Sequence, residues 1–180
     1  MLDGDITAFT VMDTGDIFYV TNKPSQFSSK VMIWDGRKSS LYLELNSYYI
    51  SEMVPFQEGI AVIARQNQQP WSLYFLDLKT QKFSSLLSLD TPISRLSVED
   101  DILNFTTIKE QSYASYRYDR QSGQVYELGE GNYVKSGVSV DKKLFFFGLD
   151  ITGEDLYSQQ LITKNIYFCT EIFFFNNFTY

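Results

Sequence analysis

The chain has 180 residues, of which 17% are aromatic, and its formal net charge is −7. An acidic surplus of this size disfavours nucleic acids and anionic membrane surfaces as partners. Because the chain contains no histidine, it cannot build a Ser-His-Asp or Cys-His catalytic system, nor a zinc site that uses imidazole. The single cysteine, Cys169, excludes an internal disulfide.

The first repeating unit is expected over about residues 5–45 and contains four short apolar runs separated by turn signals. The run ITAFTVM ends at a Thr-Gly-Asp turn, and IFYV follows from Ile17. The third run, VMIWDG, ends at Asp35, and LYLEL opens at Leu41. Alternating β-branched and aromatic residues bounded by Gly and Asp predict strands that are joined by tight turns.

The same pattern recurs along the rest of the chain. The third runs of three units end at equal steps of 42 residues, at Asp35, Asp77 and Asp119. The second runs open at Ile17, Ile60, Ile102 and Leu144. A period of about 40–45 residues with four strands per unit is typical of β-propeller blades. We therefore predict a single all-β domain over 1–180. It is a propeller-like array of four four-stranded antiparallel blades, at about 5–45, 48–89, 92–128 and 133–172, either complete or part of a larger propeller.

The repeat also predicts which side chains are buried alike. One apolar residue in the first run of each unit forms a column of equivalent buried positions: Val11, Val54, Leu96 and Val138. The third unit carries Ser115 and Arg117 where the second carries Leu73 and Phe75. One face of that strand is therefore expected to be wetter than its counterpart.

The C-terminal segment departs from the repeat. The run 166–175 stands where the outermost strand of the fourth blade is expected, and its only charge is Glu171. Because an apolar edge strand invites pairing, we expect further blades or a second copy of the chain to cover it. The sequence does not open with a signal-peptide pattern, and its longest apolar stretch is too short to span a membrane. The compartment is left open.

The units resemble the WD-like repeats of TolB-type propellers and the propeller domains of the prolyl oligopeptidase family. The resemblance rests on SLYFLDLKTQKFSSLL and SYRYDRQSGQVYEL, in which an alternating strand ends at Asp and a polar turn leads into a second apolar strand. It covers about residues 5–161. It implies a propeller fold, and it implies that any hydrolase activity would belong to a separate catalytic domain.

The innermost strand of a propeller blade lines the central channel, where ligands and partner segments bind. When the units are aligned, Arg95 occupies one position of this strand, and Glu52 and Lys135 lie one and two residues before the same position in their own units. We take these three as candidate ligand-binding or partner-binding residues at the channel mouth. The alternative is an ion pair between Glu52 and Arg95, or a solvated channel wall. The sequence predicts no catalytic residue, no metal ligand and no cofactor.

Three functions remain open at this point. The first is a non-catalytic binding or scaffold module for a protein or peptide, since propellers present variable loops on rigid strands. The second is the gating propeller of a prolyl-oligopeptidase-like serine hydrolase whose catalytic domain is absent from this chain. The third is a carbohydrate or small-ligand binder, in which Tyr113 and Trp71 would stack on the ligand.

Overall fold

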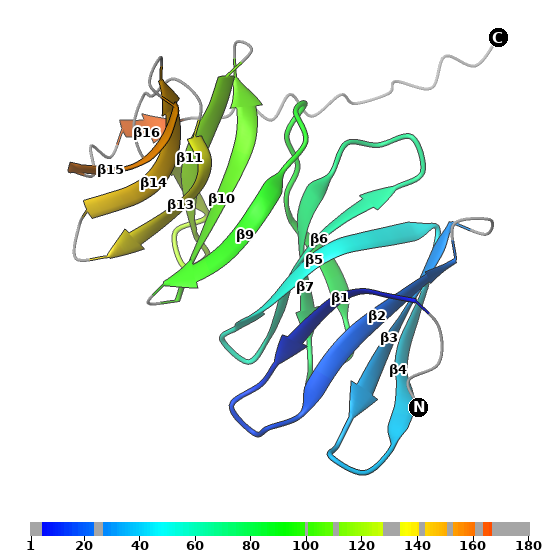
Figure 1. The fold of residues 1–180 in the computed structure, drawn as a ribbon. Helices are drawn as coiled ribbons and strands as arrows, with labels where there is room; N and C mark the ends of the chain where they lie inside the picture. Colours follow the sequence, from blue (N-terminus) through cyan, green and yellow to red (C-terminus); the bar gives the residue numbers. More distant parts are fainter. Residues whose placement is uncertain are drawn as a thin grey trace, which may run out of the picture.

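The computed structural model describes residues 5–23, 27–99, 101–109, 112–127, 134–140, 143–150, 153–160 and 164–166. All the regular structure in these ranges is β-strand, so the predicted fold class is confirmed. The sheets follow one another along an arc, with the first blade and the last sheet at its two ends (Figure 1). Within the described ranges, no helix exists that could cross a membrane.

Three antiparallel sheets have the strand order of the chain, as blades require. The first blade consists of β1 (Ile6–Val11), β2 (Ile17–Lys23), β3 (Ser28–Trp34) and β4 (Ser39–Asn46). The second consists of β5 (Tyr48–Phe56), β6 (Gly59–Gln66), β7 (Ser72–Asp77) and β8 (Phe83–Leu87). The third consists of β9 (Ser94–Glu99), β10 (Ile102–Lys109), β11 (Ser112–Asp119) and β12 (Gln124–Glu127).

The last sheet has three strands among the described residues. They are β13 (Val134–Val140), β14 (Lys143–Asp150) and β15 (Gly153–Gln160). The next strand, β16 (Lys164–Ile166), pairs antiparallel with β12 at the outer edge of the third blade. Most of the segment that was expected to complete the fourth blade, 167–175, lies outside the described residues.

The repeated aspartates are explained by one local hydrogen-bond pattern. The Oδ1 atom of Asp35 accepts the backbone N–H groups of the residues two and three positions later, at 2.9 and 3.0 Å. Asp77 does the same at 2.8 and 2.9 Å, and Asp119 at 2.8 and 3.5 Å. Each aspartate thus closes the turn between the third and fourth strands of its blade, which is the role for which Asp is favoured in turns.

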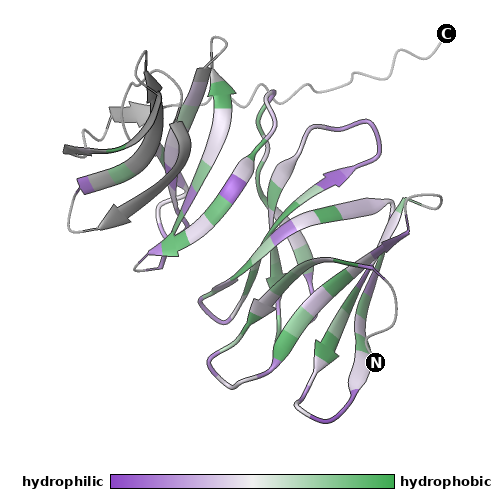
Figure 2. Cartoon of the chain, viewed as in Figure 1, coloured by the Kyte–Doolittle hydropathy of each residue, from purple (hydrophilic) through white to green (hydrophobic). Residues whose placement is uncertain are grey.

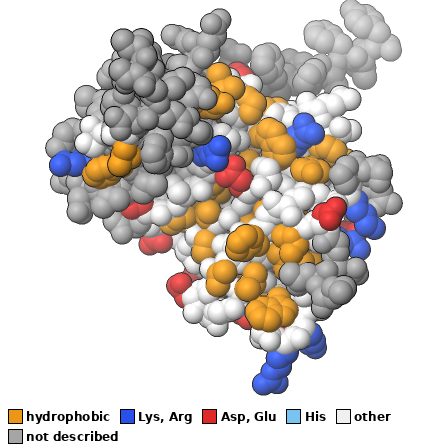
Figure 3. Space-filling model, viewed as in Figure 1, with side chains coloured by type: hydrophobic (Ala, Val, Ile, Leu, Met, Phe, Trp, Pro, Cys, Tyr) orange, Lys and Arg blue, Asp and Glu red, His pale blue; other side chains and the backbone are white. Residues whose placement is uncertain are grey.

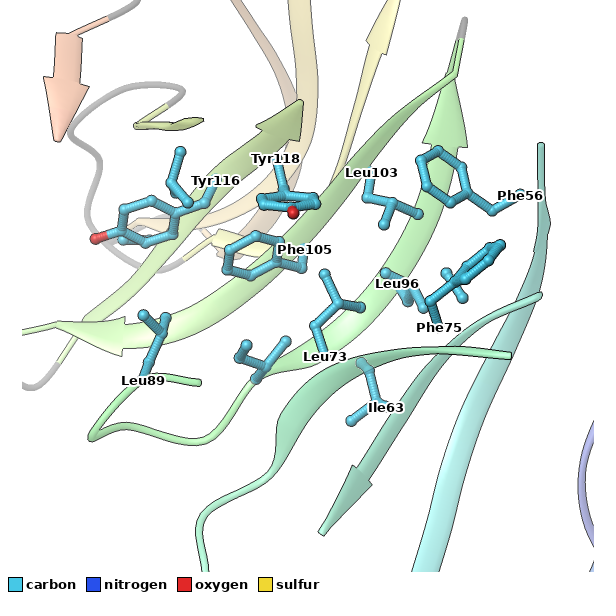
Figure 4. Close-up of a cluster of buried hydrophobic side chains, with 14 residues drawn as sticks. Phe56, Ile63, Leu73, Phe75, Leu89, Leu96, Leu103, Phe105, Tyr116 and Tyr118 are labelled. Carbon is cyan, nitrogen blue, oxygen red and sulfur yellow. The ribbon is translucent and has the colours of Figure 1, made fainter. Parts of the chain in front are cut away.

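The blades are held together by their apolar faces. On one face of the second blade, Ile63, Leu73 and Phe75 pack with residues of the third blade in one buried cluster (Figure 4). On the other face, Ile60 and Val62 belong to a cluster shared with the first blade. Figure 2 shows stretches of hydrophobic residues along the strands of the first blade. Burial of apolar area from both sides is therefore what stacks the sheets.

The innermost strands lie side by side, since β1 packs on β5 and β5 packs on β9. The predicted column of equivalent buried residues on these strands is wrong. Leu96 is buried, but the Val11 side chain is 50% exposed. The reason lies in the turns: five residues separate β1 from β2, whereas two separate β5 from β6 and β9 from β10. As a result, Val11 pairs with Ile17, whereas Ile60, the equivalent of Ile17 in the second blade, pairs with Pro55 rather than with Val54.

The third blade has one polar face, but that face is covered. Ser115 is 3% exposed, so the expectation of a wetter face is wrong for this side chain, and Arg117 is half-buried. Asn104, on the neighbouring strand, is also 3% exposed. Strand β13 of the last sheet packs against β9, β10 and β11. Buried polar atoms without a hydrogen-bond partner, among them the Asn104 amide and the Ser115 hydroxyl, gather on this blade. The face of the third blade toward the last sheet is thus more polar than the faces that join the first blade to the second and the second to the third.

The aspartate turns predict a pH dependence of stability. Hydrogen bonds from the turn lower the pKa of each carboxyl: from Lys38 to Asp35, from Thr80 to Asp77, and from the Ser122 side chain to Asp119. Because these pKa values are lower in the folded state, the ionised carboxylates stabilise the fold above the unfolded value of about 3.9. That stabilisation is lost as the pH falls through the folded values.

We expect the urea midpoint of the wild type to fall between about pH 4 and about pH 2. In a variant with Asn at all three aspartate positions, the urea midpoint should fall less over this pH range. The amide oxygen of Asn accepts the same hydrogen bonds but does not titrate. Superimposable pH profiles for the two proteins would contradict this assignment.

Candidate binding face

Every innermost strand carries a β-bulge near its beginning. One extra residue interrupts the pairing with the next strand at Thr7 in β1 and at Ser51 in β5. In β9, two residues, Arg95 and Leu96, stand between paired positions where β10 has one. Strand β13 has the same interruption between Val134 and Gly137. Because a bulge bends a strand and re-aims its side chains, the same end of each blade is reshaped in the same way.

Side-chain hydroxyls stabilise the bulges in the first two blades. Thr7 Oγ1 donates to the carbonyl of Val20 at 3.4 Å, and Ser51 Oγ donates to the carbonyl of Ile63 at 3.3 Å. In the third blade, Thr106 Oγ1 donates to the carbonyl of Ser94 at 3.1 Å. A short hydroxyl side chain therefore satisfies a carbonyl near the interruption of the ladder in each of the first three blades.

The carboxylate of Glu52 connects the second blade to the third. Its two oxygens accept the backbone N–H groups of Arg95, at 3.1 Å, and Leu96, at 2.9 Å. Arg95 has a positive φ of 58°, a conformation that non-glycine residues seldom adopt. The bulge turns two consecutive N–H groups toward one carboxylate, and such charge-assisted hydrogen bonds are stronger than neutral ones.

The structure places the three sequence-predicted site residues at this row of bulges. Glu52 follows the bulge of β5, Arg95 lies in the bulge of β9, and Lys135 lies in the interrupted part of β13, where the backbone alone is described. Glu52 and Arg95 meet through the backbone of Arg95. Within the described residues, the Arg95 guanidinium is exposed and has no ion pair with Glu52.

Two polar side chains missed in the sequence make the equivalent connection between the first and second blades. Asn22 Nδ2 donates to the carbonyl of Ile50 at 2.8 Å. Ser29 Oγ donates to the carbonyl of Tyr48 and accepts the N–H of Ile50, both at 3.1 Å. The only sequence signal was a polar residue inside each of two predicted strands. Both connections between blades thus satisfy backbone groups of an innermost strand near its bulge.

An arginine surrounded by aromatic rings lies at the same end of the blades. The Arg65 guanidinium carbon is 5.4 Å from the ring centroid of Phe27 and 5.0 Å from that of Trp71. Tyr49 lies beside both rings, with centroids 6.2 Å from Phe27 and 6.1 Å from Trp71. These four residues, which we call the arginine–aromatic cluster, come from strand ends and connections of the first two blades. Tyr49 lies in β5 and Arg65 in β6, while Phe27 lies in the β2–β3 connection and Trp71 in the β6–β7 connection. Of these four residues, only Trp71 could be singled out from the sequence, because contacts between neighbouring strands and blades leave no pattern within a single strand.

The cluster is partly open to solvent. Arg65 is exposed, and the three rings are half-buried. In the described part of the chain, the guanidinium has rings as neighbours and no carboxylate partner. Its N–H donors are therefore available while its position is fixed by cation–π contacts. Among the same residues, no three His, Cys, Asp or Glu side chains are arranged to hold a metal ion.

Comparisons with known proteins support the fold. No protein-family model and no curated protein matches the sequence. Among solved structures, TolB from Acinetobacter baumannii is similar, with a TM-score of 0.65 and 20% identity over 90% of this chain and 43% of TolB. The fold is a TolB-like β-propeller. At this identity, the comparison shows the fold alone.

Two peptidase structures have the same fold in part. The β-propeller domain of the Trilobed protease from Pyrococcus furiosus gives a TM-score of 0.60 and 17% identity, over 90% of this chain and 52% of that one. A puromycin-hydrolyzing peptidase from Mycobacterium tuberculosis gives a TM-score of 0.67 and 10% identity, over 91% of this chain and 29% of the peptidase chain. The chain therefore spans about half the length of the propeller domain and less than a third of the whole peptidase.

The hydrogen bonds of Glu52 predict that two substitutions at this position lower the free energy of unfolding by different amounts. Glu52→Ala leaves two backbone N–H groups without their acceptor and should lower the free energy of unfolding by about 1–3 kcal/mol. Glu52→Gln keeps one acceptor and should cost less. Glu58→Ala is a matched control, because Glu58 is exposed and bonds only to the exposed Lys79, at 2.6 Å. Equal midpoints in urea for the Ala variants at positions 52 and 58 would contradict the role of Glu52.

Proposed function

We propose that this chain is a non-catalytic propeller module that binds a protein or peptide at the end of the blades where β1, β5 and β9 begin. The observation that carries the proposal is the arginine–aromatic cluster. Arg, Trp and Tyr are the residue types that most often dominate binding energy at protein interfaces. Here they are partly exposed, lie together at one end of the second blade, and are joined there by Phe27 of the first blade.

The arrangement suits a peptide because a fixed guanidinium offers several donors in one plane. Backbone carbonyls and carboxylates of a partner can accept from Arg65 while apolar side chains contact Trp71 and Tyr49. Arg95, on the neighbouring innermost strand, adds a second exposed guanidinium at the same end. We include Glu52 and Lys135 as contributors to this face: Glu52 shapes the bulge that presents Arg95, and Lys135 occupies the corresponding part of β13.

A carbohydrate binder is a weaker alternative for the same residues. Sugar rings stack on an open aromatic face, but the Arg65 guanidinium already lies 5.0 Å from the ring centroid of Trp71. A role as the gating propeller of a hydrolase has no specific observation in its favour. The chain has no histidine, so a Ser-His-Asp triad would have to come from another polypeptide segment.

Selection from a phage-displayed library of random peptides tests the proposal without knowledge of the natural partner. The dissociation constants of enriched peptides are then measured by fluorescence anisotropy for the wild type and for Arg65→Ala, Arg65→Lys and Trp71→Ala. We expect at least about tenfold weaker binding for the two Ala variants, the loss typical of a hot-spot residue. The Lys variant should also bind more weakly, because it keeps the charge but loses the planar stacking.

Arg37→Ala is the matched control, since Arg37 is exposed in the β3–β4 turn at the opposite end of the first blade. Its dissociation constants should stay within about twofold of the wild type. If no peptide is enriched, or if Arg37→Ala weakens binding as much as Arg65→Ala, the proposed face is wrong.

A further inference from the structure

The exposed large hydrophobic side chains are concentrated at the two ends of the arc of blades. Eight such side chains occur among the described residues, and six of them belong to the first blade or the last sheet. In Figure 3, hydrophobic side chains gather over the first blade and also show on the last sheet. Soluble chains seldom expose large apolar patches unless the patch is an interaction site.

At the first end, strand register puts four of these residues on one face of the sheet. Ile6 pairs with Thr21, Phe9 pairs with Tyr19, and Val11 pairs with Ile17. Because these three partners are every second residue of β2, they share one face of the sheet with Ile6, Phe9 and Val11. Leu41 joins them, because it pairs with Met32 and Met32 pairs with Tyr19. We call this surface the head face: Ile6, Phe9, Val11 and Leu41, which are 39%, 65%, 50% and 51% exposed.

The opposite face of the same sheet is already a contact between blades. Ala8, Val20 and Val31 are buried in the cluster shared with the second blade. The first blade is therefore apolar on both faces, like the second blade, which is covered from both sides. Antiparallel sheets with one solvated face normally alternate apolar and polar residues, so the head face has the composition of a sheet that is covered.

At the other end, the last sheet exposes a smaller apolar face. Phe145 pairs with Ser158, and Phe147 pairs with Leu156, so Phe145 and Leu156 lie on one side of the sheet. Phe145 is 37% exposed and Leu156 is 59% exposed. We call this surface the tail face. The same sheet contacts the third blade through β13.

We propose that a second copy of this chain covers both surfaces, with the head face of each copy packed on the tail face of the other. Two arcs would then close into one ring with two identical contacts. The comparison supports a second copy as the occupant, because one chain spans 52% of the Trilobed protease propeller domain. Two chains together therefore match the length of one whole propeller. Head-to-tail contacts that close on themselves form finite rings, whereas contacts that do not close form filaments.

Sedimentation equilibrium of the purified chain at micromolar concentrations tests the ring. We expect a mass of twice the 20.9 kDa of one chain. Phe9→Asp on the head face and Leu156→Asp on the tail face should each give monomers, because each substitution damages both contacts of the ring. Ile108→Asp is the matched control: Ile108 is 43% exposed but lies on the third blade, and this variant should remain dimeric.

Mixing the two monomeric variants separates this arrangement from any other dimer. The intact tail face of Phe9→Asp can pack on the intact head face of Leu156→Asp, so the mixture should regain dimers with one good contact. Unchanged circular dichroism and urea midpoints would show that both variants are folded, and Phe9→Ser replaces Phe9→Asp if the charge disturbs the sheet. A monomeric wild type, a Leu156→Asp variant that stays dimeric, a mixture without dimers, or a mass that keeps growing with concentration would each overturn the proposal.

Discussion

In β6, six consecutive side-chain positions from Gly59 to Ala64 are buried, so the second blade has to be covered on both faces. The first blade covers one face and the third blade the other, and the two buried clusters share no residue. A sheet of this kind is not stable by itself, because an exposed apolar face costs roughly 25 cal/mol for each Å² left in water. The stacking of blades along an arc follows from this constraint.

Close stacking brings the innermost strands together, and their backbone groups then need partners away from water. The bulges and the side chains beside them supply these partners. Glu52 accepts two N–H groups of the third blade, while Asn22 and Ser29 bond to the backbone of the second. The same end of the blades carries the exposed Arg65. A rigid, hydrogen-bonded framework thus supports the loops on which binding residues are most often found.

The period and the four-strand unit could be predicted from the sequence because Asp77 and its counterparts mark the same turn in three blades. The prediction that Val11 belongs to a column of equivalent buried residues is wrong, because a longer turn shifts the register of β1 by one position. Residue spacing alone does not show the length of that turn. The sequence placed Glu52 and Arg95 together but could not show that the contact uses the backbone of Arg95. The arginine–aromatic cluster depends on contacts between different strands and connections, which no pattern within one strand reveals.

The central claim is that neighbouring blades share one core and are therefore not independent units. Native-state hydrogen exchange of the backbone amides in β6 and β10 tests it most directly, because these strands contribute Ile63 and Leu103 to the same cluster. The account predicts that the most protected amides of both strands open with the same free energy and the same dependence on denaturant. If β10 opened at a clearly lower free energy while β6 stayed protected, the shared core would not couple the blades and the account would be contradicted.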